Sequence, residues 1–98
     1  MKVTWSPTAL ERAGEIAQFI ALDDPVAAEH WVEGLFQSVG RLRDHPESGR
    51  IVPEFGIFRI REVIYGAYRV IYALHEEVEI LTVRRASQLL RDDEIRSR

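Results

Sequence analysis

The chain has 98 residues, a formal net charge of −3 at pH 7 and no cysteine. This length suits a single domain with one modest core, so we expect residues 1–98 to form one unit. Without cysteine there is neither a disulfide framework nor a thiolate zinc site, which fits a reducing compartment. The net charge argues against nucleic-acid binding through overall charge. No apolar run is long enough to span a membrane and no signal-like leader precedes the domain, so we expect a soluble, cytoplasmic protein without membrane contacts.

The N-terminal residues predict a short strand followed by a helix. Residues 2–5, with the sequence KVTW, form a β-type run. Ser6 is then a suitable N-cap, and Pro7 fits the first helical position, where its missing amide costs nothing. Apolar residues follow at helical spacing and predict a helix that ends near Leu22.

A second helix start follows at Asp24-Pro25. From there the apolar residues lie four, three, four and three positions apart, at Ala28, Val32, Leu35, Val39 and Leu42. This spacing makes an apolar seam suited to packing on a partner helix. Because only about three residues separate the two predicted helices, we expect an antiparallel helical hairpin.

The pattern becomes β-type from Ile57 onward. Residues 57–65, 67–75 and 78–85 are rich in β-branched and aromatic side chains, and they predict a three-stranded antiparallel meander. A polar tail follows, with a helical turn or two predicted from Gln88. The expected fold is therefore α+β, with an N-terminal strand, an antiparallel helical hairpin packed on a small antiparallel β-sheet, and a short C-terminal helical tail.

Arginines interrupt these apolar strands. Twelve of the thirteen basic residues are arginine, which suits bidentate recognition of phosphate or carboxylate but cannot accept a proton as a base. Arg59 and Arg61 are two positions apart and should point to the same face of a strand. The face taken by Arg69 depends on the length of the turn at Gly66-Ala67, because a change of one residue in register reverses it.

Two interpretations of these arginines remain open at this point. In the first, they mark a solvated sheet face, with Arg61 or Arg69 bridged to Glu62 or Glu79. In the second, a set of basic residues with an interleaved tyrosine lines one edge of the sheet and binds phosphates or an acidic peptide. This candidate set is Arg59, Arg61, Arg69, Arg84, Arg85 and Tyr68.

The sequence offers no independent motif for catalysis, a cofactor or a metal. His30, His45 and His75 show no ligand spacing, so we expect no metal site. There is also no Ser-His-Asp order, no Gly-rich phosphate loop and no convincing pair of carboxylates. We therefore expect no cofactor.

Several segments in succession resemble the RelE/ParE superfamily, the toxins of type II toxin–antitoxin systems. They are WSPTALERAGEIAQFI, DPVAAEHW, LRDHPESGR, VPEFGIFRIREV, YRVIY and VEILTVRR, between Val3 and about Leu90. The resemblance implies a compact α+β toxin of the plasmid-stabilization type that arrests growth when free. It also implies an antitoxin that wraps the toxin, often over the basic sheet face and the helical hairpin. RelE-like members cut messenger RNA in the ribosomal A site, whereas ParE-like members poison DNA gyrase.

The residues favour the ParE-like branch. RelE-like cleavage would place Arg59, Arg61, Arg69 and Arg85 around the scissile phosphate as the catalytic set. In that branch lysines precede the "YR" strand, but here arginines stand there, and arginine cannot take the 2′-hydroxyl proton. The tail also lacks the tyrosine that RelE-like enzymes carry. We therefore expect a gyrase inhibitor whose candidate set contacts antitoxin or target. The alternatives are a ribosome-dependent endoribonuclease and a non-toxic family member that acts only as an interaction partner.

Overall fold

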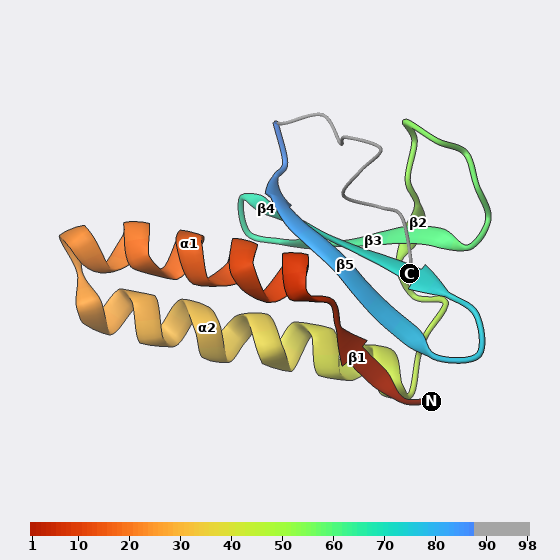
Figure 1. Ribbon diagram of the computed structural model, residues 1–98, viewed down its shortest axis with the longest axis horizontal. Helices are drawn as coiled ribbons and strands as arrows, with labels where there is room; N and C mark the ends of the chain where they lie inside the picture. Colours follow the sequence, from red (N-terminus) through yellow and green to blue (C-terminus); the bar gives the residue numbers. More distant parts are fainter. Residues whose placement is uncertain (88–98) are drawn as a thin grey trace.

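The computed structural model describes residues 1–87, so the helical turn predicted from Gln88 lies outside the described residues. Two long helices lie side by side and pack against a twisted sheet (Figure 1). In chain order the elements are β1 (Val3–Trp5), α1 (Pro7–Asp23), α2 (Pro25–Gly40), the 3₁₀ turn η1 (Arg41–Arg43), β2 (Arg50–Ile51), β3 (Ile60–Tyr65), β4 (Tyr68–Leu74) and β5 (Val78–Arg85). Neither helix in this part of the chain has the length and apolar character needed to cross a membrane.

Both predicted helix starts are confirmed. Ser6 caps α1, since its Oγ accepts a hydrogen bond from the backbone N–H of Ala9 at 3.0 Å. Asp24 serves both helices: its backbone N–H donates to the carbonyl of Ile20 in α1, and its carboxylate accepts from the first turn of α2. Because one residue ends α1 and caps α2, the two helices form the tight antiparallel hairpin that the spacing predicted.

The sheet has the strand order β1-β5-β4-β3-β2. The predicted meander is confirmed, with β3, β4 and β5 joined as consecutive antiparallel pairs. β1, however, runs parallel to β5, with Val3 opposite Val78 and Trp5 opposite Ile80. The sheet is therefore mixed and not purely antiparallel. The sequence does not reveal this orientation, because the two paired strands lie at opposite ends of the chain.

The turn between β3 and β4 decides which face each arginine takes. Tyr65 pairs with Tyr68 across a two-residue loop, in which Gly66 has a φ of +58° that favours glycine. With this register Arg61 lies opposite Tyr72, while Arg69 lies opposite Ile64. Arg61 and Arg69 therefore project from opposite faces of the sheet.

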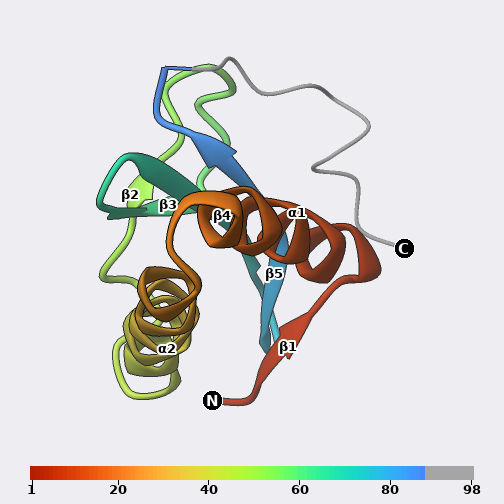
Figure 2. The same cartoon turned by 90° about the vertical axis from the view of Figure 1, so that its left-hand side faces the viewer.

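The two faces of the sheet bury separate apolar clusters. The two helices lie on one side of the sheet (Figure 2). There their buried side chains pack with those of β4 and β5, and the largest residues of this cluster are Leu35, Leu42, Tyr72 and Ile80. On the other side a smaller cluster joins Val52 and Phe55 to Ile60, Ile71, Ala73 and Leu81. The segment between β2 and β3 therefore covers part of the face that the charged residues had suggested was solvated.

Candidate interaction surface

Arg69 is committed to two carboxylates inside the protein. Its Nη1 and Nη2 donate to the two carboxylate oxygens of Glu54 at 2.6 and 2.7 Å, and its Nε donates to Glu62 at 2.6 Å. The Arg69 side chain is only 6 % exposed. The pairing of Arg69 with Glu62 was one of the bridges that the solvated-face interpretation allowed, but here it is buried, and Glu54 from the segment between β2 and β3 joins it.

Glu62 extends this contact into a chain of four alternating charges. Its side chain is fully buried, and its second carboxylate oxygen accepts a hydrogen bond from Nε of Arg50. The order Glu54, Arg69, Glu62, Arg50 gives each buried charge an opposite partner, as buried charges require. The hydrogen bonds to Glu54 raise the pKa of Arg69. Burial opposes them by desolvating the guanidinium, and the hydrogen bond to Glu62 raises the pKa further. We call these four residues the Arg69 network.

Arg61 performs a structural task on the opposite face. Its Nη1 donates to the carbonyls of Glu47 and Gly49 at 3.2 and 3.0 Å, and the ring of Phe58 lies 4.6 Å from its Cζ. Arg61 is therefore buried and holds the segment that leads into β2. Arg59 precedes β3 and is exposed, so the structure does not place the two in one exposed surface.

Tyr72 fastens the same segment from β4. Its hydroxyl accepts from the backbone N–H of Gly49 at 3.0 Å and donates to the carbonyl of Pro46 at 2.7 Å. Burial raises the pKa of Tyr72, so its hydroxyl keeps the proton that it donates. The Tyr72 ring is fully buried in the helix-facing core cluster.

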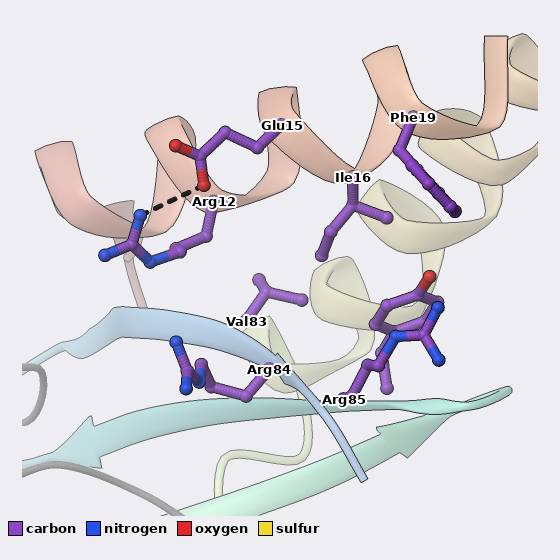
Figure 3. A pocket seen from close by; sticks show the side chains of 8 residues that line it. Arg12, Glu15, Ile16, Phe19, Val83, Arg84 and Arg85 are labelled. Carbon is purple, nitrogen blue, oxygen red and sulfur yellow. Dashed lines mark hydrogen bonds and ion pairs between the residues drawn. The ribbon is translucent and has the colours of Figure 1, made fainter. Parts of the chain in front are cut away.

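The remaining candidates meet in a groove between α1 and the end of β5 (Figure 3). Its volume is about 490 Å³, and it is lined by Arg12, Glu15, Ile16, Phe19, Tyr68, Val83, Arg84 and Arg85. Arg12 donates to Glu15 at 3.0 Å, and Phe19 is 63 % exposed at its rim. Tyr68 packs edge-on against Trp31 with ring centroids 5.3 Å apart. We call this feature the α1–β5 groove.

The chemistry of the α1–β5 groove suits a mixed apolar and acidic ligand. Three arginines and one glutamate leave it with a positive balance, and aliphatic and aromatic side chains form its walls. Such a site can hold a peptide that presents carboxylates beside apolar side chains. The sequence interpretation missed Arg12 and Phe19, which lie on a distant helix. The available signal was an aromatic residue, Phe19, next to the predicted end of the first helix.

Within residues 1–87 there is no cluster of three or more histidine, aspartate or glutamate side chains that could hold a metal ion.

The arginines of the candidate set fall into two groups. Arg61 and Arg69 are buried and contact the scaffold, whereas Arg84 and Arg85 line an open groove. The structure does not bring the four residues of the predicted catalytic set onto one surface.

This arrangement defines the chain as a small α+β protein with an open groove between α1 and β5. Among solved structures, it resembles one titled "Chromosomal ParDE TA system from P. aeruginosa", with a TM-score of 0.72 and 19 % identity over 87 % of this chain and 95 % of the other. It is 36 % identical over 89 residues to "Putative toxin Y4kP" of Sinorhizobium fredii, covering 89 % of this chain and 90 % of that protein. Residues 3–90 match the family described as "ParE toxin of type II toxin-antitoxin system, parDE". The chain belongs to the ParE toxin family.

Proposed function

We propose that this toxin arrests growth by binding DNA gyrase in the cytoplasm when its antitoxin is absent, and that it does not cleave messenger RNA. The observation that carries this choice between targets is the Arg69 network. All three nitrogens of the Arg69 guanidinium donate to carboxylates. Glu54 takes both Nη donors, which are the donors that a phosphate would use for a bidentate contact. A scissile phosphate would have to displace a partner that is already held in place.

The other residues that a nuclease site would need do not lie together around Arg69. Arg61 donates to backbone carbonyls on the opposite face, and Arg85 lines the α1–β5 groove. Glu62 is a poor candidate for a general base, because it is fully buried and paired with two arginines. These contacts support a protein that acts by binding and not by proton transfer.

The α1–β5 groove is the surface that we assign to partners. Of the candidate set, Arg84, Arg85 and Tyr68 line it, and Arg12 and Phe19 join them from α1. Its positive balance complements an antitoxin segment that carries acidic and apolar residues. Arg59 is exposed outside this groove, and Arg61 and Arg69 support the scaffold beneath the surface.

Mapping of messenger RNA 5′ ends after induction without antitoxin tests the choice of target. We expect growth arrest with no new ends in register with codons, because no cluster of free phosphate-binding groups surrounds a proton acceptor. A chain truncated by an early stop codon is the matched control. New ends in codon register would contradict the proposal and establish ribosome-dependent cleavage. Normal growth would instead identify a family member that acts only as an interaction partner.

A further inference from the structure

The sheet edge beside β2 is covered over only part of its length. β2 pairs with β3 at two positions, Arg50 with Glu62 and Ile51 with Arg61, although β3 continues to Tyr65. Among residues 1–87 no other strand lies on this side of β3. Residues 63–65 therefore form an open strand edge, which we call the β3 edge.

Hydrogen bonds near the start of β3 show which backbone groups point outward along this edge. The N–H of Val52 donates to the carbonyl of Ile60 at 3.1 Å on the β2 side, whereas the N–H of Leu74 donates to the carbonyl of Arg59 at 2.7 Å on the β4 side. The pairing of β3 with β4 is regular throughout the strand. Because successive residues alternate in direction, Ile64 turns its N–H and its carbonyl outward, away from β4.

Basic side chains line a groove beside the β3 edge. This groove of about 380 Å³ runs between this edge and the end of α2, and the charged or ionisable residues that line it are Arg41, His45, Arg50 and Glu62. Glu62 is buried and paired with Arg50 and Arg69, so its charge is already balanced. The exposed arginines of the groove, Arg41 and Arg50, are cationic.

We propose that the β3 edge receives an extended, acidic segment of the antitoxin, which adds a strand to the sheet by pairing with Ile64. Backbone pairing at an exposed edge supplies affinity, and carboxylates placed over Arg41 and Arg50 supply specificity. The same basic residues disfavour pairing between two copies of the chain, because they would bring like charges together. This inference depends on the proposed function in one respect, which is that the added segment comes from the antitoxin.

Charge reversal at Arg41 tests the side-chain part of the inference. We expect Arg41→Glu to weaken binding of the cognate antitoxin by about tenfold or more, measured by calorimetry at low salt. Arg43→Glu is the matched control: it makes the same change in charge two positions away, on an exposed residue that does not line the groove, and it should change the affinity less than about twofold. Equal effects of the two substitutions would overturn the inference, after thermal unfolding confirms that both variants are folded.

Amide hydrogen exchange tests the backbone part. In the complex the outward N–H of Ile64 should exchange at least about a hundredfold more slowly than in the free toxin, while the N–H of Val63, which faces β4, stays protected in both. Antitoxin binding without protection of Ile64 would overturn this inference and leave the proposed function intact. Absence of any antitoxin binding would overturn both. Protection of Ile64 in the free toxin that grows with toxin concentration would show that a second copy occupies the edge instead.

Discussion

Replacement of Arg69 by methionine is expected to lower the free energy of unfolding by about 3–5 kcal/mol, because it leaves a buried carboxylate without its main partner. Glu62 is fully buried and shares its two oxygens between Arg69 and Arg50, and Arg50 is 64 % exposed. The surface arginine cannot neutralise Glu62 as well as the buried one. Urea denaturation monitored by tryptophan fluorescence measures the loss.

Two variants separate the pairing of Arg69 from its packing. Arg59→Met removes an exposed arginine outside the network and should change stability by less than about 0.5 kcal/mol. Adding Glu62→Met to Arg69→Met removes the stranded carboxylate and should restore part of the loss, since apolar replacement of a buried ion pair is often tolerated. A loss below about 1 kcal/mol for Arg69→Met alone would contradict a structural role for this arginine.

The second large effect is expected at Gly49, where an added methyl group has no room. A Cβ built there would lie 2.6 Å from the hydroxyl oxygen of Tyr72 and 2.7 Å from the backbone carbonyl oxygen of Glu62. The backbone atom cannot rotate away, and displacement of Tyr72 would break its hydrogen bonds to Gly49 and Pro46. Gly49→Ala should therefore destabilise the fold by about 3 kcal/mol in the same denaturation assay.

Gly14→Ala is the matched control for this substitution. Gly14 lies within α1, and a Cβ there would meet no atom within 4 Å. Because alanine favours a helix interior over glycine, this variant should gain about 0.5–1 kcal/mol. A neutral effect of Gly49→Ala beside a gain at Gly14 would show that the segment leading into β2 is not held as tightly as its contacts indicate.

Local patterns predicted the helical hairpin and the meander, because the signals for those elements lie within a few residues of the structure they form. Ser6 and Asp24 cap helices that begin at the next residue, and the β-branched strands follow one another across short turns. The parallel pairing of β1 with β5 could not be predicted in this way. It depends on contacts between β1 and β5, whose paired residues Val3 and Val78 lie far apart in the sequence.

The candidate site was harder to predict for a similar reason. The faces of Arg61 and Arg69 depended on one turn residue, and the partner of Arg69 lies 15 positions earlier in a segment with no regular pattern. Arg84 and Arg85 were candidates from the sequence, and we still assign them to partner binding. The groove that they line has its other wall in α1, which the sequence did not connect with them. A charge pattern identifies residues that need partners, whereas long-range packing decides what those partners are.

The buried arginines and the arginines of the groove should differ in how their substitution affects toxicity. Arg61 and Arg69 stabilise the fold, so substitutions there should impair toxicity only through loss of folded protein. Arg84 and Arg85 line an open groove, so substitutions there should alter binding while the fold persists. An enzyme that depended on Arg69 for chemistry would show the opposite pattern, with stable but inactive variants.

A gyrase cleavage assay with purified toxin, supercoiled DNA and ATP tests most directly whether the toxin acts on gyrase. We predict that the free toxin makes gyrase accumulate covalent breaks in DNA, and that an equimolar amount of antitoxin suppresses them. Unchanged gyrase activity, together with codon-register cleavage of messenger RNA in a purified translation system, would contradict it.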